Sequence, residues 1–147
     1  MQVKIKRLDK SIPLPQYQTP GSVAFDIASS VDTIINPKEI QLIPTGLIIQ
    51  APAGHMLMLS SRSSLIKKKG LMLGNGIGIV DEDYCGPQDE IKIQLINVTD
   101  VPAEIKKGDR LAQGTFVPIT RGEFSEVETI EKSDSRGGFG GTGGYNR

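Results

Sequence analysis

The chain has 147 residues, close to the length of one average domain. Hydrophobic residues make up 37% of it and 17 more residues are glycine, a composition that excludes a wholly disordered chain. Seventeen basic residues balance seventeen acidic ones, so the sequence predicts no general attraction to nucleic acid.

The sequence also predicts a cytoplasmic protein that does not bind membranes. Its apolar runs are far shorter than the about 20 residues that a membrane-spanning helix needs, and residues 1–7 contain charges without an apolar signal core. Cys85 is the only cysteine. No disulfide can therefore form within one chain, which suits a reducing compartment.

Short apolar segments separated by turn residues indicate an all-β fold. Residues 3–6 alternate between apolar and charged, as a half-buried strand does. Further strands are expected at residues 46–51, 55–59, 77–80 and 91–96. Nine prolines leave room for one short helix, Ser63–Lys69, ended by Gly70. The pattern favours a sandwich or barrel over a βαβ fold.

The C-terminal end differs in composition from the rest. Six of the fourteen residues from 134 to 147 are glycine, and the segment has too few apolar groups to order by itself. We therefore expect one β domain over residues 1–133 and a flexible arm over residues 134–147. The arm is either a linker or a segment that orders on another surface.

Several kinds of catalytic site are excluded by what the chain lacks. His55 is the only histidine and lies in a strand pattern, so one subunit can build neither a Ser-His pair nor a multi-histidine metal site. Cys85 has no CxxC partner, and no phosphate-binding Gly-Lys-Ser/Thr loop occurs. Catalysis would rest on carboxylates, amides, arginines and an externally supplied metal.

The densest polar cluster comes directly after an apolar strand end, where residues 77–80 run into Asp81, Glu82, Asp83 and Tyr84. Period-two geometry predicts Asp81 and Asp83 on one face. Two such carboxylates can hold a water and accept its proton, or bind Mg²⁺. On spacing alone, a solvated acidic turn is an equally good interpretation.

Three other clusters could bind anions or rings. The serines around Arg62 could hold an anion, although an ordinary helix cap explains them better. Arg110 and Gln113 fall on opposite faces of a regular strand and could share a site only across a bend or bulge. Phe139 could stack on a planar ring while Arg136 binds phosphate, or both could belong to a linker.

Five segments, in their order and spacing, resemble the motifs of the trimeric dUTPase family (dUTP diphosphatases) over nearly the whole chain. They are residues 21–27, 62–65, 75–86, 108–113 and 136–143. The resemblance implies a jelly-roll-like distorted β-barrel assembled as a homotrimer. In that family the active sites lie at subunit interfaces, and the glycine-rich arm of another subunit closes over the nucleotide and excludes water.

The resemblance also implies roles for individual residues. Asp81 would deprotonate the attacking water and accept the deoxyribose 3′-hydroxyl, and Tyr84 would pack under the sugar and exclude a 2′-hydroxyl. Asp26 would reach Mg²⁺ through its waters. The other substrate contacts would come from Arg62, Ser63, Ser64, Asn75, Gly78, Arg110, Gln113, Arg136, Phe139 and Gly140.

The implied reaction is Mg²⁺-dependent hydrolysis of dUTP to dUMP and pyrophosphate by in-line attack of water on the α-phosphorus, which keeps uracil out of DNA. Four departures from the family pattern stand out. Ala24 and Ser64 replace glycines, Arg136 directly precedes Gly137, and residues 87–89 are extra. We expect the extra residues to lengthen a hairpin tip.

Three alternatives compete with this interpretation. The nearest is dCTP deaminase, or a bifunctional deaminase-dUTPase of the same fold, although such enzymes need a glutamate base and usually lack a Gly-Gly-Phe-Gly tail. The others are a trimer that binds partner proteins with the nucleotide site as a switch, and a purely structural jelly roll. The presence of Asp81 argues against an inactive site.

Overall fold

The computed structural model describes residues 1–131 and contains, within that range, one helix and eleven short strands. The all-β prediction is therefore confirmed. The strands are β1 (Lys4–Arg7), β2 (Phe25–Ala28), β3 (Thr33–Ile35), β4 (Ile40–Pro44), β5 (Leu47–Gln50), β6 (His55–Ser61), β7 (Leu71–Leu73), β8 (Gly78–Val80), β9 (Lys92–Asn97), β10 (Ala103–Ile105) and β11 (Arg110–Pro118), and the helix is α1 (Leu65–Lys69).

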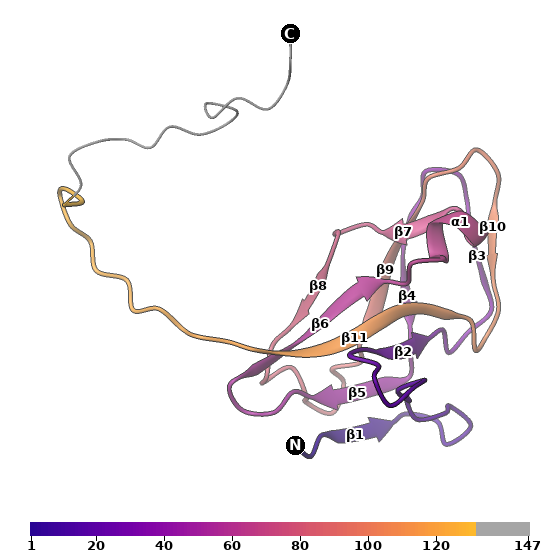
Figure 1. The fold of residues 1–147 in the computed structure, drawn as a ribbon. Helices are drawn as coiled ribbons and strands as arrows, with labels where there is room; N and C mark the ends of the chain where they lie inside the picture. The colour runs from indigo at the N-terminus through magenta and orange to yellow at the C-terminus, as the bar shows by residue number, and fades with distance from the viewer. Residues whose placement is uncertain (132–147) are drawn as a thin grey trace, which may run out of the picture.

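The strands pair antiparallel in four groups. The largest sheet has the order β2-β11-β6-β8, and a second has the order β4-β9-β7. Two further pairs, β1-β5 and β10-β3, complete the set. Figure 1 shows β11 lying between β2 and β6, so strands from both ends of the chain form the sheet.

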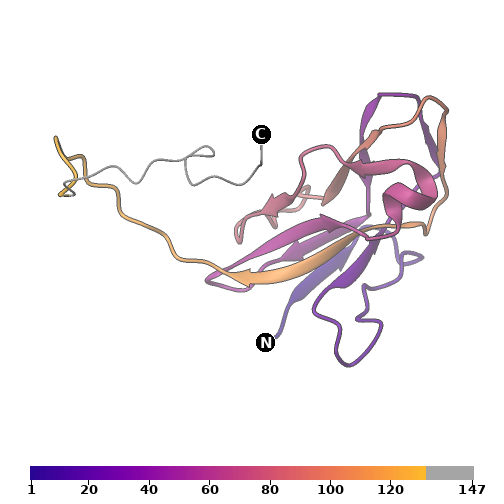
Figure 2. The same ribbon diagram turned by 45° about the horizontal axis from the view of Figure 1, so that its top comes forward.

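Alternation along the strands produces the core. In β9, Ile93, Leu95 and Asn97 are buried while the residues between them face outward. Buried side chains of both larger sheets, among them Leu57 and Leu95, belong to one apolar cluster. Beyond β11 the chain leaves the body as an extended, exposed segment (Figures 1 and 2). Among residues 1–131, no helix is long and apolar enough to cross a membrane.

The expected helix forms, but it is shorter than predicted. It begins at Leu65 rather than Ser63, because Ser64 occupies the N-cap position. It ends at Gly70 as predicted, where a φ of 64° requires the left-handed conformation that glycine adopts easily. A Cβ at position 70 would also lie 2.1 Å from the methyl group of Thr99.

Candidate active site

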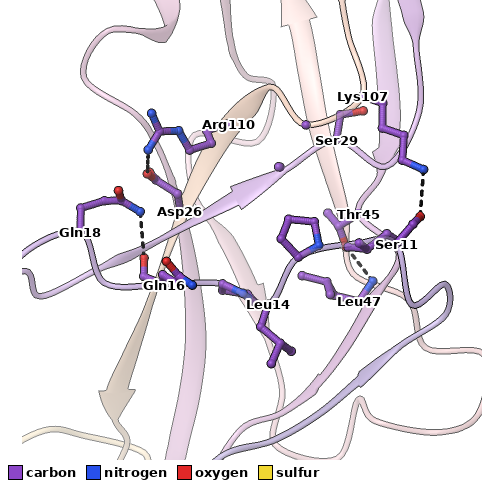
Figure 3. Close-up of a pocket in the computed structure, with 15 residues that line it drawn as sticks. Ser11, Leu14, Gln16, Gln18, Asp26, Ser29, Thr45, Leu47, Lys107 and Arg110 are labelled. Atoms are coloured by element: carbon purple, nitrogen blue, oxygen red, sulfur yellow. Dashed lines mark hydrogen bonds and ion pairs between the residues drawn. The ribbon is translucent and has the colours of Figure 1, made fainter.

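A buried carboxylate with two arginine partners forms the first part of the site. The Asp26 side chain, on β2, is only 6% exposed. Arg110 Nη1 donates to Asp26 Oδ2 at 3.1 Å, and Arg62 Nε lies 2.8 Å from Asp26 Oδ1. Figure 3 shows the Arg110 side chain, from the neighbouring strand β11, pointing toward Asp26. Two guanidinium groups offset the cost of burying this carboxylate.

The contact between Arg62 and Asp26 is an ion pair without hydrogen-bond geometry. The two atoms are close, yet the Nε–H is not directed at the oxygen, and neither buried atom has a hydrogen-bond partner. Asp26 Oδ1 therefore keeps an unused acceptor position. Such a position is where a water molecule can bind.

A β-bulge places Arg110 and Gln113 on the same face of β11. The register shifts between Arg110 and Ala112, so that Arg110 lies opposite Ala28 and Gln113 lies opposite Asp26. Because Ala28 and Asp26 are two residues apart on β2, their partners share one face. The bulge that Arg110 and Gln113 need in order to share a site is therefore present. We call Asp26, Arg62, Arg110 and Gln113 the Asp26 cluster.

Ser63 and Ser64 lie between the Asp26 cluster and α1. Ser63 is exposed, and Ser64 makes no side-chain capping hydrogen bond although it stands at the N-cap. The simple capping explanation therefore does not account for the Ser64 hydroxyl. A contact of these serines with phosphate stays a prediction.

Residues 81–84, which we call the Asp81 turn, form the second part of the site. β8 ends at Val80, and the Tyr84 N–H then donates to the Asp81 carbonyl at 3.2 Å. The prediction that Asp81 and Asp83 share one strand face is wrong, because the chain turns where aspartates favour turns. The alternative interpretation of these residues, an exposed acidic turn, describes the local structure, and Asp81 lies at the start of that turn.

Asp81 lines a cleft of about 390 Å³. Its wall consists of Leu42, Ile79, Val80, Asp81, Tyr84, Glu90, Ile91 and Lys92. The Tyr84 hydroxyl donates to the Glu90 carbonyl at 3.3 Å, which fixes the ring at the edge of the cleft. Asp81 and Tyr84, which lie three residues apart in the sequence, therefore line the same cleft. Both residues are exposed in the single chain.

Asn75 and Gly78 lie before the Asp81 turn along the same segment. Asn75 is exposed in the turn that precedes β8, next to Gly76, whose φ is 72°. Gly78 lies on β8 opposite Leu59, and a Cβ there would come within 3.1 Å of the Leu59 Cβ. A side chain at position 78 would therefore be crowded against Leu59, and glycine leaves only its main-chain groups for a ligand.

The Asp81 turn and the Asp26 cluster lie at opposite ends of one sheet. Val80 pairs with Leu57, so Asp81 comes next at the level of Met56, near the start of β6. Arg62 comes just after the end of β6. Six residues of strand separate the two levels, about 20 Å at roughly 3.3 Å per residue. One chain alone does not bring the two parts together.

The extra residues after Gly86 do not lengthen a hairpin, because β8 pairs with β6 whereas β9 pairs with β4 and β7. They form a loop between two sheets instead. The loop closes on itself, since the Gly86 N–H donates to the Asp89 carboxylate at 2.6 Å.

The sequence missed one wall of the site. A cleft of about 440 Å³ opens beside Asp26 and Arg110, and its other side is the N-terminal segment from Ser11 to Gln18 (Figure 3). The only sequence signal there was the prolines at 13, 15 and 20, which keep the segment extended.

Two acidic side chains near the site have lowered pKa values. For Glu82, the Gly54 N–H and then Arg121 stabilise the charged form and lower the pKa. For Asp109, burial acts to raise the pKa, but the Lys106 N–H and the Lys69 ammonium outweigh it and lower the pKa. Arg136, Phe139 and Gly140 lie outside the described residues.

Comparisons with known proteins agree with the motif pattern. A family model described as dUTPase matches residues 10–143. The chain is 42% identical to the deoxyuridine 5′-triphosphate nucleotidohydrolase of Shewanella oneidensis, with 96% of each chain covered. It is 43% identical to the protein of that name from Desulfitobacterium hafniense, over 96% of this chain and 97% of the relative.

Solved structures share the fold. The dUTPase of Streptococcus mutans aligns with a TM-score of 0.76 and 31% identity, over 84% of this chain and all of that one. The dUTPase of Staphylococcus bacteriophage 80alpha, solved with dUPNHPP, aligns with a TM-score of 0.84 and 26% identity, over 95% and 96% of the two chains. The predicted dUTPase-like β fold is confirmed, and the chain belongs to the dUTPase family.

Proposed function

We propose that the chain hydrolyses dUTP to dUMP and pyrophosphate, with Asp81 as the general base that activates the attacking water. The observation that carries this proposal is the position of Asp81 on the wall of a cleft beside Tyr84. The names of the relatives and a neighbour solved with a dUTP analogue support dUTP as the substrate. The reaction keeps uracil out of DNA.

Each active site is shared between copies of the chain. The separation of about 20 Å between Asp81 and Arg62 supports this, because a water held by Asp81 must attack a phosphorus held by the arginines. We propose the homotrimer that the motif pattern implies, with the Asp81 turn of one copy facing the Asp26 cluster of another.

An apolar surface beside the Asp81 cleft supports this assembly. Ile40, Ile96 and Met72 stand side by side on the outer face of the β4-β9-β7 sheet. Leu42 and Ile79, which line the cleft, are 58% and 60% exposed. Exposed apolar groups gathered in this way mark a surface that another protein covers. Here we propose a second copy.

The proposed contacts divide by chemistry. Tyr84 packs under the deoxyribose and leaves no space for a 2′-hydroxyl, so UTP is rejected. Asn75 and the main chain of Gly78 read the uracil edge. The guanidinium groups of the Asp26 cluster, with Gln113, Ser63 and Ser64, hold the phosphates and neutralise charge that develops during the attack.

The dUTPase family is generally metal-dependent, and we propose Mg²⁺ for this chain. Among residues 1–131, no three His, Cys, Asp or Glu side chains form a metal-ligand group. Asp26 fits the ion through a water, because its Oδ1 lacks a hydrogen-bond partner while both arginines already offset its charge. The substrate phosphates would supply most ligands, and Mg²⁺ would neutralise part of their charge.

We place the reaction in the cytoplasm. Cys85 is a free, partly buried thiol within the described part of the chain, and it is the only cysteine of the sequence. A reducing compartment keeps such a thiol unmodified.

A substrate panel tests the proposed activity. In the presence of Mg²⁺, we expect pyrophosphate from dUTP and little or none from dCTP, dTTP or UTP, because uracil and the 2′-position are both selected. Pyrophosphate and ammonia are measured for each nucleotide. Ammonia release from dCTP would instead establish the deaminase alternative, which the family comparisons do not favour.

Removal of residues 134–147 tests the arm. We propose that Arg136, Phe139 and Gly140 complete the site of another copy and exclude water from it. The truncated protein should keep its melting temperature, because the apolar core lies before the arm, and should lose most of its turnover. Calorimetry and pyrophosphate release measure the two effects. Unchanged turnover would show that the segment is only a linker.

A further inference from the structure

The side chain of Glu82 ties the Asp81 turn to two other parts of the chain. Its Oε2 accepts a hydrogen bond from the Gly54 N–H at 2.8 Å, and its Oε1 lies 2.9 Å from Arg121 Nη2. Glu82 stands between Asp81, the proposed base, and Tyr84, which packs under the deoxyribose in the proposed function. A middle residue of the Asp81 turn is therefore bonded to two residues that lie outside the turn.

Gly54 connects this contact to the end of β11. It lies in the turn between β5 and β6 with a φ of 72°, and its carbonyl accepts a hydrogen bond from the Ile119 N–H at 2.9 Å. The adjacent His55 pairs with Pro118. The β5–β6 turn thus lies between the Asp81 turn and the place where β11 ends, with one main-chain group bonded to each.

Arg121 stands where the chain leaves the body. Its side chain is 69% exposed, whereas that of Glu82 is 26% exposed. Residues 122–131 are all exposed and extend away from the sheets (Figure 1). The ion pair between Glu82 and Arg121 therefore joins the Asp81 turn to the starting point of the C-terminal segment.

We propose that Glu82 is a positioning residue for dUTP hydrolysis and acts through two separable contacts. The charge-assisted hydrogen bond from Gly54 holds Asp81 and Tyr84 at the cleft, so it acts on kcat. The ion pair with Arg121 limits the directions in which the C-terminal segment departs, so it lowers the ordering cost of substrate binding and acts on KM. The kcat part of this proposal rests on the proposed role of Asp81 as the base, and the KM part rests on the proposed role of residues 134–147 at the site.

Three variants separate the two contacts. Arg121→Gln removes the ion pair and leaves Glu82 bonded to Gly54. Glu82→Gln likewise removes the ion pair but keeps a side-chain oxygen that can accept a hydrogen bond from the Gly54 N–H. Both should raise KM by about two- to fivefold, the range of an exposed ion pair, with kcat nearly unchanged. Glu82→Ala removes both contacts, and we expect kcat to fall about 10²-fold because the base is misplaced.

The matched control is Asp100→Asn, which removes the exposed ion pair between Asp100 and Lys38 at 3.0 Å. It should change neither kcat nor KM. Salt provides a readout that a merely structural role would not move. The ratio of the KM of Arg121→Gln to that of the unaltered protein should fall toward one as salt screens the ion pair, whereas the kcat defect of Glu82→Ala should persist.

Wild-type kcat in Glu82→Ala would overturn the positioning role, and an unchanged KM in Arg121→Gln would overturn the ion-pair part. If Glu82→Ala does not fold, Glu82→Met, which keeps most of the side-chain volume but cannot accept from the Gly54 N–H, takes its place: wild-type kcat in Glu82→Met would overturn the positioning role. An unchanged KM in both glutamine variants would overturn the ion-pair part. Asp81→Asn, measured in parallel, distinguishes a failure of the proposed role of Asp81 from a failure of the proposed role of Glu82. Full activity in that variant rejects Asp81 as the base, whatever the Glu82 variants do.

Discussion

Asp81→Asn is expected to lower the turnover of dUTP by a factor of about 10²–10⁴, the usual contribution of a general base. Asparagine has nearly the same shape as aspartate but cannot accept the proton of the attacking water. Asp81 contributes its main-chain carbonyl to the turn, and its side chain is exposed. The fold should therefore be unaffected. Pyrophosphate release and the melting temperature measure both effects.

The matched control for this variant is Asp83→Asn, which removes an exposed carboxylate two residues later in the same turn. Its turnover should stay near that of the unaltered protein, since Asp83 does not line the cleft that Asp81 lines. The base assignment is wrong if Asp81→Asn releases pyrophosphate at nearly the normal rate, or if both substitutions reduce it equally.

Arg62→Met is expected to lower kcat by a factor of about 10²–10³, comparable to the loss of one group that stabilises charge in a transition state. The substitution keeps most of the side-chain volume but removes a positive charge from the phosphate site. It also leaves the buried Asp26 with Arg110 as its ion-pair partner. We therefore expect a lower melting temperature together with the kinetic defect.

A second arginine separates these two effects. Arg7 stabilises a different part of the fold, where its Nη1 donates hydrogen bonds to the main-chain carbonyls of Lys10 and Ile12. Arg7→Met should lower the melting temperature and leave kcat unchanged when measured well below that temperature. If Arg62→Met behaves in the same way, Arg62 is structural and does not hold phosphate.

The two inactive variants together test whether sites are shared. Co-expression of the Asp81→Asn and Arg62→Met chains should restore activity, since about one site in four then combines two unaltered residues if protomers mix at random. Separately purified variants that have not exchanged subunits are the control. If mixed oligomers form without recovery of activity, both residues must act within the same chain.

The sequence predicted the elements that depend on local patterning. Alternation located β1 and β9 to within one or two residues, and Gly70 ended the helix, because burial on one face and a left-handed φ leave direct traces in residue type. The five-segment pattern identified the family. The comparisons confirm that membership, whereas the roles of the individual site residues stay predictions.

The sequence failed where backbone geometry departed from regularity. The strand expected at residues 77–80 ends at Val80 as predicted, but period-two geometry placed Asp81 and Asp83 on one face although the chain turns there. It also placed Arg110 and Gln113 on opposite faces, with a bulge left as a condition. A bulge adds one residue to a strand, so that every later side chain points to the opposite face from the one that regular alternation predicts. No residue type between Arg110 and Ala112 indicates that a bulge forms there.

By itself, the sequence determined which side chains are available for chemistry and which segments become strands, because both depend on residue type and spacing. Tertiary structure decided which of these side chains meet. Glu82 contacts Gly54, 28 residues away, and Arg121, 39 residues away. Asp81 and Arg62, only 19 positions apart in the numbering, end at opposite ends of a sheet. Antiparallel register sets these distances, and register depends on how whole strands bury their apolar faces together.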